Sequence, residues 1–384
     1  MEATFHRRLD EIDAAAWDAL RPDDNPFLAH AFLAGLERHG CIQPKLGWQP
    51  HHLAIRDGER LVAAAPLYLK ANSHGEFVFD WAWADAYERH GHDYYPKLLA
   101  AVPYSPVNGP RLLAGGDAAL EAAAARTIAA CVEKLRLSSA HVNFVMPTQT
   151  DAFDEADWLP RHDWQFHWRN RGWRDFADFL DALTAKKRKN IRQERALVAK
   201  AGVDVVRVTG DAMTVEDWDF VYACYRATFD DKGNYPALTR EFFGHLGTAM
   251  PRNVMAAIAR RDGERIAMAL FLQSSTTLYG RYWGAFEEVP GLHFEACYYQ
   301  GIEHCIAQGL QGFEPGAQGE HKIARGFLPT RTTSFHHIRD ARFRRAIAAS
   351  LADETVERQW RGDELMRHSP YREDARDDGA EPAA

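Results

Sequence analysis

The chain has 384 residues, about twice the usual size of a domain, and this length predicts two domains. Hydrophobic residues make up 46% of it and charged residues 26%, which is typical of globular proteins and excludes fibrous and disordered classes. The net charge of −8 disfavours indiscriminate binding to polyanions, and no DNA partner is expected. The amino terminus lacks the apolar core of a signal peptide, and no apolar run is long enough to span a membrane. We therefore expect a cytoplasmic protein.

The first half of the chain predicts a strand, two helices, a β-hairpin, a third strand, a long helix and two further strands. In chain order these elements are TFHRRL, Ala14–Leu20, His30–His39, the hairpin within AIRDGERLVAAAPLYL, EFVFDWAWA, Asp117–Leu137, HVNFVM and DWQFHWR. The Asp-Gly pair inside the hairpin marks its turn, because both residues tolerate the positive φ that a tight turn requires.

The second half repeats this order of elements. In chain order they are VDVVRVT, VEDWDFVYACYRATF, TREFFGHL, the hairpin within IARRDGERIAMALFLQ, TTLYGRYWGAF, the helix Phe294–Gln308, GFE and RTTSFHHI. Both hairpins contain the same Asp-Gly-Glu-Arg turn, beginning at Asp57 and at Asp262. We interpret this internal echo as a duplicated domain.

A strand, two helices, three antiparallel strands, a helix and a further parallel strand resemble the GNAT acyltransferase fold. The sequence therefore predicts an α+β protein with a mixed sheet, built from two tandem GNAT-like domains at residues 1–170 and 171–350. Residues 351–384 are expected to form a C-terminal helix and a tail. The tail is polar and charge-rich, which predicts disorder beyond about Arg367.

In such a fold the fourth and fifth strands of a domain run parallel and splay apart, and ligands bind beyond the carboxyl ends of such strands. Three polar and aromatic clusters of the second domain are predicted to meet there in one cleft, namely RYWGAFEE, GLHFEACYYQGIEHC and PGAQGEHKIARGF. In the first domain, MPTQTDAF follows the corresponding strand and lacks the Glu-His-Lys cluster. We therefore expect the chemistry in the second domain.

These clusters, together with KKRKNIRQER and PYSPVNGPRLL, resemble the FemAB-like family of predicted N-acyltransferases, labelled peptidoglycan biosynthesis or recognition. The resemblance covers the chain to about Pro370 and implies transfer of an acyl or aminoacyl group to an amine. One departure concerns the donor: EEVPGLHFE stands where the GNAT pyrophosphate loop, Arg/Gln-x-x-Gly-x-Gly/Ala, is expected. The donor implied is aminoacyl-tRNA or an acyl-coenzyme A, and the missing loop argues against coenzyme A.

Acyl transfer to an amine requires a base for the ammonium proton, donors for the developing oxyanion and often an acid for the leaving group. The catalytic candidates are Glu295, Glu320 and His321 as base and Tyr298 or Tyr299 as acid. The candidates for substrate binding are Arg281, Trp283, His293, Glu314, Gln318, Lys322 and Arg325. Arg281 and Trp283 alternate with Tyr282 on a predicted strand, so we expect them to share one face of the sheet.

The run KKRKNIRQERALVAK predicts a basic helix whose buried stripe is Leu180, Leu183, Ile191 and Val198. Its candidate donor-binding residues are Lys186, Lys187, Arg188, Lys189 and Arg192. Such a density of cations in an acidic chain indicates a phosphate-bearing partner such as tRNA, coenzyme A or an anionic lipid intermediate. A merely solvated helix face is the alternative.

Two other functions compete with acyl transfer. A metal site formed by His293, Glu295, Glu320 and His321 is disfavoured, because neighbouring residues rarely ligate one ion together and the five cysteines are scattered. A non-catalytic protein that binds a peptidoglycan precursor or similar anionic ligand would use the same cluster. The preferred prediction is an N-acyltransferase whose acceptor is a small-molecule or peptide amine, on a cell-wall precursor or another metabolite.

Overall fold

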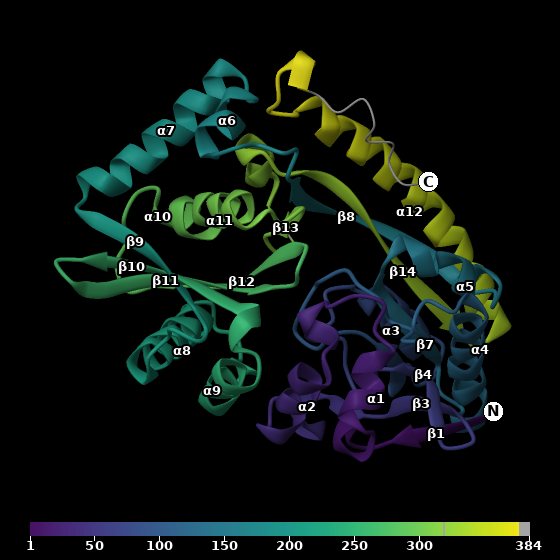
Figure 1. Cartoon of the computed structure of the whole chain (residues 1–384). Coiled ribbons are helices and arrows are strands. Elements are labelled where there is room, and N and C mark those ends of the chain that lie inside the picture. The colour runs from purple at the N-terminus through teal and green to yellow at the C-terminus, as the bar shows by residue number, and fades with distance from the viewer. Residues whose placement is uncertain (318, 376–384) are drawn as a thin grey trace. The chain divides into compact units, whose positions relative to one another are not determined.

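The computed structural model describes residues 1–317 and 319–375 of the chain (Figure 1). The chain divides into two units, each described by itself. Unit 1 comprises Met1–Asp163 and Arg331–Arg361, and unit 2 comprises Trp164–Thr330 and the chain from Gly362 onward. No helix in the described residues is long and apolar enough to cross a membrane.

Unit 1 contains an antiparallel sheet of order β1-β3-β4 and a second run of paired strands of order β2-β5-β6-β7-β14. The strands are β1 (Glu2–His6), β2 (Trp48–Pro50), β3 (His52–Asp57), β4 (Arg60–Ala65), β5 (Leu67–Lys70), β6 (Lys97–Ala100), β7 (Ser139–Val145) and β14 (Leu328–Ile338). The helices are α1 (Ala14–Ala19), α2 (His30–Arg38), α3 (Trp81–Arg89), α4 (Ala118–Leu135), α5 (Thr150–Asp154) and α12 (Ala341–Arg367). Both β14 and α12 extend past the boundary of the unit.

The strand order of unit 1 depends on one proline. Pro66 separates β4, which pairs with β3, from β5, which pairs with β2 and β6. Because proline has no backbone N–H to donate to a strand partner, the strand breaks there and changes sheet. The next strand, β6, runs antiparallel to β5 and parallel to β7.

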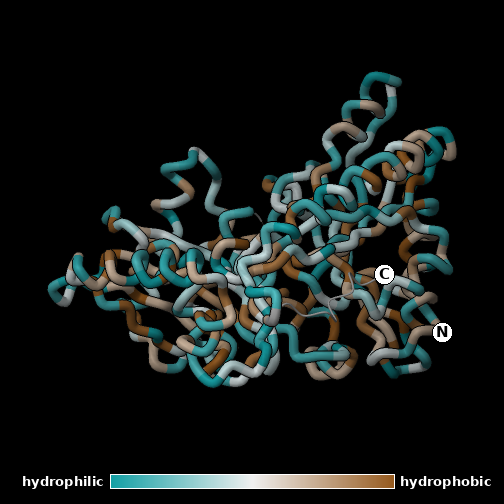
Figure 2. The backbone as a smooth tube through the Cα atoms, turned by 90° about the horizontal axis from the view of Figure 1, so that it is seen from above, coloured by the Kyte–Doolittle hydropathy of each residue, from teal (hydrophilic) through white to brown (hydrophobic). Residues whose placement is uncertain are grey.

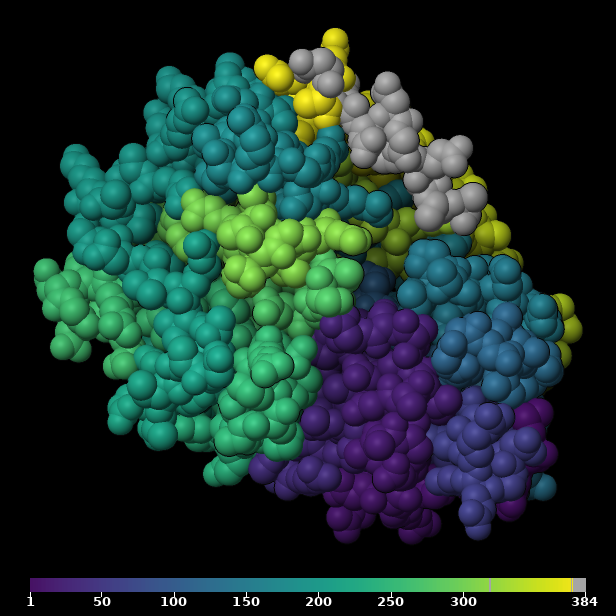
Figure 3. All heavy atoms as spheres, viewed as in Figure 1, coloured from purple at the N-terminus to yellow at the C-terminus, as the bar shows by residue number. Residues whose placement is uncertain are grey.

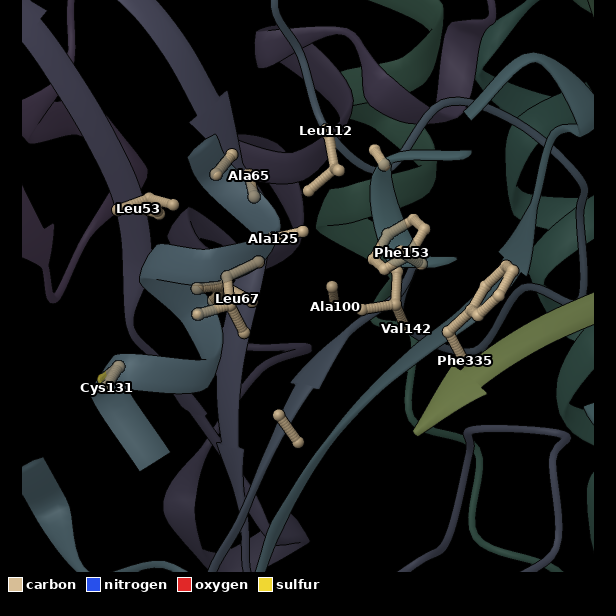
Figure 4. Packing of buried hydrophobic residues seen from close by; sticks show 14 of the residues in the cluster. Leu53, Ala65, Leu67, Ala100, Leu112, Ala125, Cys131, Val142, Phe153 and Phe335 are labelled. Carbon is tan, nitrogen blue, oxygen red and sulfur yellow. The ribbon is translucent and has the colours of Figure 1, made fainter. Parts of the chain in front are cut away.

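The core of unit 1 forms where α4 packs on these strands. Figure 4 shows Leu67, Val142 and Phe153 pointing into the same space as Ala125 of α4. All four side chains are buried, and each large one contributes roughly 1.5–3 kcal/mol to stability relative to an exposed position. In Figure 2 most of the hydrophobic stretches lie toward the inside of the trace, whereas many of the outer loops are hydrophilic.

Unit 2 contains a mixed sheet of order β8-β13-β12-β11-β10-β9. The strands are β8 (Leu159–Arg169), β9 (Val203–Thr209), β10 (Val254–Arg261), β11 (Glu264–Gln273), β12 (Thr277–Ala285) and β13 (Gly312–Glu314). The helices are α6 (Phe176–Asp181), α7 (Ala185–Lys200), α8 (Val215–Asp231), α9 (Arg240–Ala249), α10 (Leu292–Phe294) and α11 (Gln300–Gln308), with a π-helical turn at Glu295–Tyr299 between the last two. Figure 1 shows α7, α10 and α11 over one face of this sheet and α8 and α9 over the other.

Local sequence signals position the helices of unit 2. The side chain of Thr214 accepts a hydrogen bond from the backbone N–H of Asp217, whose carboxylate accepts one from the backbone of Thr214, so the start of α8 is capped in both directions. Further along α8, the carbonyl oxygen of Cys224 approaches Gly284 of β12 so closely that a Cβ there would lie 2.3 Å away. Only glycine lets this helix and strand meet backbone to backbone.

The predicted order of elements is confirmed in both halves, with two differences in the first half. The second strand of its hairpin is divided at Pro66 into β4 and β5. EFVFDWAWA was predicted as the third strand of the first domain, whereas the segment leads into α3 and the third strand is β6. The burial of Trp83 and Tyr87, four residues apart, is the helical pattern that decides this segment. Its β-rich composition is misleading because tertiary packing overrides propensity.

The units also differ from the expected ranges 1–170 and 171–350. DWQFHWR ends the first half and lies in β8, but its last two residues pair with β13 of unit 2. RTTSFHHI ends the second half and pairs, as β14, with β7 of unit 1. Each half therefore supplies the closing strand of the other unit, an exchange that the order of elements along the chain does not reveal.

The prediction that the chain is disordered beyond Arg367 is wrong for residues 368–375, and residues 376–384 lie outside the described part. Tyr371 is 1% exposed, and its hydroxyl donates to the carbonyl oxygen of Gly326 at 2.8 Å. The backbone N–H of Thr184 donates to Pro370 O at 2.9 Å. An aromatic ring in a polar tail is thus enough to anchor this segment in the core of unit 2.

We expect Tyr371→Ala to lower the free energy of unfolding by about 3–5 kcal/mol, the usual effect of truncating a buried aromatic ring. Tyr371→Phe, which removes only the hydrogen bond to Gly326, should lower it by about 1 kcal/mol. Urea unfolding measures both, and Arg367→Ala, at an exposed neighbour, is the control. Equal stability of Tyr371→Ala and the control variant would contradict the anchoring role.

Candidate functional site

The parallel strands of unit 2 separate as predicted. β12 pairs with β13 only from Thr277 to Tyr279, opposite Gly312 to Glu314. β13 ends there, while β12 continues to Ala285 along β11. Beyond Gly280, β12 has a partner strand on one side only among the described residues. The helix that begins at α10 and the loop that follows β13 both lie at this point of separation.

The π-helical turn at Glu295–Tyr299 brings a tyrosine of this helix to the loop. The Tyr298 hydroxyl lies 3.0 Å from Nε2 of His321. π turns insert an extra residue into a helix and are frequent at functional sites. His321 lies in a short 3₁₀ helix, Glu320–Arg325, so the turn joins two of the three predicted clusters through a side-chain hydrogen bond.

Electrostatics keep both partners of this hydrogen bond neutral. Burial raises the pKa of Tyr298 well above its ordinary value, so the hydroxyl stays protonated. Desolvation, with Arg325 and Lys322 nearby, lowers the pKa of His321, so its imidazole stays neutral at neutral pH. The pair is a neutral acid joined to a neutral base.

A second imidazole links this pair to β12. The ring of His293 lies 5.3 Å from that of Trp283 and 5.5 Å from that of Tyr298, edge to face in both cases. Burial and the positive charges of Arg325 and Lys322 lower the pKa of His293 to about 4. His293 is therefore uncharged, and its ring packs between Trp283 of β12 and Tyr298 of the π-helical turn.

Lys322 is a buried amine whose hydrogen-bond partner is a backbone carbonyl. The residue is 3% exposed, and Nζ donates to the carbonyl oxygen of Gly316 at 2.6 Å. Burial lowers the pKa of Lys322 to about 8. No carboxylate of the described residues pairs with Lys322. Its positive charge is therefore available to an anionic group that lies beside Nζ.

Glu295 is held in an ion pair. Both of its oxygens accept from Arg195, at 2.9 and 3.0 Å, and Gln300 donates to Oε1 at 2.8 Å. Arg195 also pairs with Glu303. A carboxylate whose oxygens already accept from this many donors is poorly placed to accept a proton from a substrate.

Arg325 supports the site from within. It donates from Nη2 and Nε to the carboxylate of Glu194, at 2.6 and 3.2 Å, and from Nη1 to the carbonyl oxygen of His321 at 2.8 Å. Its guanidinium also lies 3.3 Å from the ring centroid of Phe294. Its donors are therefore used by the protein, and Arg325 positions the backbone of His321.

Sequence analysis missed Glu194, which lies in the basic run. Glu194 accepts hydrogen bonds from Arg325 and from the hydroxyl of Tyr299, and its neighbour Arg195 turns inward to Glu295. The signal available in the sequence was one acidic residue among seven cations. A buried arginine elsewhere in the chain needs an acidic partner, and this carboxylate can supply it.

The remaining substrate candidates lie around the point of separation. A β-bulge on β12 adds Arg281 opposite the Leu270–Phe271 step, and the Arg281 guanidinium lies 5.1 Å from the ring of Tyr282. The prediction that Arg281 and Trp283 share one face is wrong, because the bulge interrupts the alternation. Glu314 ends β13 half-buried, and Glu320 is exposed. Gln318 lies outside the described residues.

The basic run lies on one helix, α7, but its predicted buried stripe begins in the preceding helix. The structure places Leu180 in α6 and Leu183 in the connection, so the predicted single buried stripe bends, although all four of its residues are buried. The donor candidates Lys186, Lys189 and Arg192 are exposed, and Lys187 and Arg188 are half-buried. Figure 3 shows the teal atoms of this region at the outer surface. Arg188 also pairs with Asp181 at 3.3 Å.

The corresponding place in unit 1 is filled by the chain itself. Beyond the parallel strands β6 and β7, Gly109 bridges to Val145. Arg111, which is 0% exposed, donates to the carbonyl oxygen of Asn143 at 2.8 Å. The motif PYSPVNGPRLL therefore packs as part of the unit 1 core. Across the chain as described, no three His, Cys, Asp or Glu side chains are arranged to hold a metal ion.

Residues 8–373 match the FemAB-like family, described as peptidoglycan biosynthesis/recognition. No curated protein matches the chain. Among solved structures, the chain is similar to the C-terminal domain of a proposed lysylphosphatidylglycerol synthetase from Agrobacterium fabrum. The TM-score is 0.55 and the identity 12%, over 91% of this chain and 96% of that one.

The chain is also similar to FemX, with a TM-score of 0.53 and 12% identity over 91% of this chain and all of that chain. A tandem GNAT protein from the clavulanic acid biosynthesis pathway matches with a TM-score of 0.43 and 12% identity, over 88% and 98% of the two chains. The likeness to FemX and to the Agrobacterium domain, together with the strand order, confirms the predicted mixed α+β fold.

Lys322→Met should make the protein more stable at neutral pH by roughly 1–3 kcal/mol, because it removes a buried, uncompensated charge. Burial lowers the pKa of Lys322 from 10.5 to about 8, so the penalty is fully present below pH 8. Between these values the folded protein loses the proton before the unfolded chain does, and the wild type gains stability with rising pH.

The advantage of Lys322→Met should therefore shrink as the pH approaches 10.5. Urea unfolding across this pH range measures it, with Lys186→Met at an exposed position as the control. A variant that is less stable than the wild type at neutral pH would show that the cation is already compensated.

Proposed function

The chain belongs to the FemAB-like family, and on that basis we propose that it is an N-acyltransferase that moves an acyl or aminoacyl group onto an amine. The chemistry is assigned to unit 2. The observation that carries the proposal is the hydrogen bond between Tyr298 and His321, 3.0 Å long, at the point where β12 and β13 separate. It provides an acid and a base side by side.

In the proposed reaction the acceptor ammonium loses one proton to solvent and the free amine attacks the carbonyl carbon of the donor, while the neutral imidazole of His321 takes a second proton from the attacking nitrogen. A C–N bond forms, and the bond from the carbonyl carbon to the leaving oxygen or sulfur breaks. The Tyr298 hydroxyl gives its proton to that leaving atom and regains one from His321. The pair thus passes one proton from the acceptor to the leaving group.

Lys322 is assigned to the developing negative charge. Its amine is buried and donates to a backbone carbonyl, so an oxyanion beside Nζ would strengthen its interaction as charge develops. Glu295 and Arg325, both used in internal ion pairs, are assigned supporting roles. Glu320, which is exposed next to His321, is the alternative base.

The donor is proposed to be aminoacyl-tRNA, with acyl-coenzyme A as the alternative. The exposed cations of α7 suit a phosphate backbone, and the segment before α10, EEVPGLHFE, lacks the glycine pattern of a pyrophosphate loop. The acceptor is proposed to be a peptide or small-molecule amine on a cell-wall precursor, in line with the description of the family.

Each of the changes His321→Gln, Tyr298→Phe and Lys322→Met should destabilise the transition state by about 2–4 kcal/mol, because each removes a positioned group. The loss is measured as a fall in kcat/KM. Because the pKa of His321 is lowered, the acid limb of the rate profile should fall below the ordinary histidine range. The measurement is transfer of a radiolabelled group from aminoacyl-tRNA, or from an acyl-coenzyme A, to an amine-bearing peptide.

Glu264→Gln, at an exposed position where β11 begins, is the control for a change of charge elsewhere in unit 2. Full activity in both His321→Gln and Tyr298→Phe would refute the assigned pair. Tight binding of the peptide without turnover by any donor would instead favour the non-catalytic binding protein.

Replacing Lys186 and Lys189 with glutamine should weaken binding of bulk tRNA and reduce the slope of log K against log salt, by about one unit for each phosphate that is no longer neutralised. The thermal midpoint should hardly change, since both side chains are exposed. Electrophoretic mobility shifts at several salt concentrations measure the effect. Arg226 and Arg252, exposed elsewhere in unit 2, provide a control pair, and equal weakening in both pairs would exclude a specific role for α7.

A further inference from the structure

Unit 1 contains a hollow of about 300 Å³ that the proposed reaction does not use. Three connections of the chain meet there: the one between α3 and β6, the one between α4 and β7, and the junction of β14 with α12. Its chemistry is set by Tyr87, His92, Arg136, Arg339, Asp340 and Phe343. Two arginines and a phenol around one small space suit an anionic ligand.

Arg339 is anchored at one end and open at the other. Its Nε donates to the carbonyl oxygen of Leu137 at 2.6 Å, and its backbone N–H donates to Ser138 O at 3.1 Å. Its two terminal nitrogens have no partner among the described residues. The anchoring fixes the guanidinium plane, so a planar or tetrahedral anion can be bound with little loss of side-chain freedom.

The carboxylates at the hollow do not neutralise this arginine. Asp340 pairs with Arg342 at 3.0 Å and accepts from the backbone N–H groups at the start of α12. Asp93, the other carboxylate of the lining, is exposed and makes no ion pair within the described part of the chain. The positive charge of Arg339 therefore remains available to a ligand.

Arg136 occupies a position where glycine is the usual residue. It follows the last turn of α4 with φ of 55°, in the left-handed region, which strains a residue that carries a Cβ. Its exposed side chain has no partner in the residues that the structure describes. Backbone strain that is kept for one particular side chain points to a use for that side chain.

Tyr87 provides a buried hydroxyl with an unmet hydrogen bond. The residue is 4% exposed, its ring stacks on Phe343 with centroids 3.8 Å apart, and its hydroxyl has no partner in the described structure. Burial raises the pKa of Tyr87 to about 12, so this group is a donor. Buried polar groups are almost always bonded, and an unmet one at the wall of a hollow suggests a missing acceptor.

We propose that this hollow of unit 1 binds a small metabolite with a phosphate or carboxylate group, held between Arg136 and Arg339 with the Tyr87 hydroxyl as a further donor. The organic part of the ligand rests against Phe343. A volume of about 300 Å³ exceeds that of inorganic phosphate and fits a small organic anion. The site is separate from the proposed transfer reaction and stands without it.

Calorimetry on the full chain with pyrophosphate, citrate and inorganic phosphate, at constant ionic strength, tests the proposal. We expect saturable binding of pyrophosphate or citrate, with a dissociation constant on the order of 1 mM or tighter, and weaker binding of inorganic phosphate. Preference for pyrophosphate identifies a phosphate ligand, and preference for citrate a carboxylate. No binding of any of the three would overturn the proposal.

Variants separate a binding site from a structural feature. Arg339→Gln should weaken binding at least about tenfold, the usual effect of losing a charge-assisted contact. Arg136→Gly should also weaken it while raising Tm, because glycine relieves the strained φ. Tyr87→Phe should weaken binding without lowering Tm. Arg89→Gln, an exposed arginine of α3 outside the hollow, is the control.

Equal weakening by Arg89→Gln would show attraction to surface charge in general and would overturn the proposal. Unchanged binding by both Arg339→Gln and Arg136→Gly would do so as well. Because Arg136→Gly should be more stable than the wild type, loss of binding in that variant cannot come from unfolding.

Discussion

The ion pair between Glu194 and Arg325 is the contact on which the candidate site of unit 2 depends. Glu194 comes from α7, and Arg325 comes from the loop after β13. Through this pair Arg325 reaches the carbonyl oxygen of His321, and the hydroxyl of Tyr299 reaches the same carboxylate. One carboxylate therefore holds the loop and the π-helical turn in the positions that let His321 meet Tyr298.

The next residue of α7 makes the same kind of contact in another direction. Arg195 pairs with Glu295 at the start of the π-helical turn and with Glu303 of α11. Removing one partner of a buried pair leaves a charge without compensation, so both pairs resist separate movement of α7 and the helix beneath it. α7 thus has two sides, with exposed cations outward and these internal pairs inward.

The two halves of the chain show how a duplicated arrangement can acquire different roles. Both contain a parallel pair of strands after three antiparallel ones, β6 with β7 and β12 with β13. In unit 1 the space after that pair is closed by Gly109 and Arg111, whereas in unit 2 it holds the Tyr298–His321 pair. Unit 1 instead keeps a small hollow lined by Arg136 and Arg339.

The sequence by itself determined most of the order of elements and the duplication, because periodicity, turn residues and the repeated Asp-Gly-Glu-Arg turn are local signals. It also predicted the three clusters of the candidate site. Tertiary structure alone decided what those clusters do. Glu295 and Arg325 have residue types suited to catalysis and binding, but Arg195 and Glu194, about a hundred residues or more away along the chain, engage them in internal ion pairs. The exchange of β8 and β14, the bulge at Arg281 and the anchoring of Tyr371 were likewise set by partners distant in sequence, and such pairings leave no periodic trace in the local pattern.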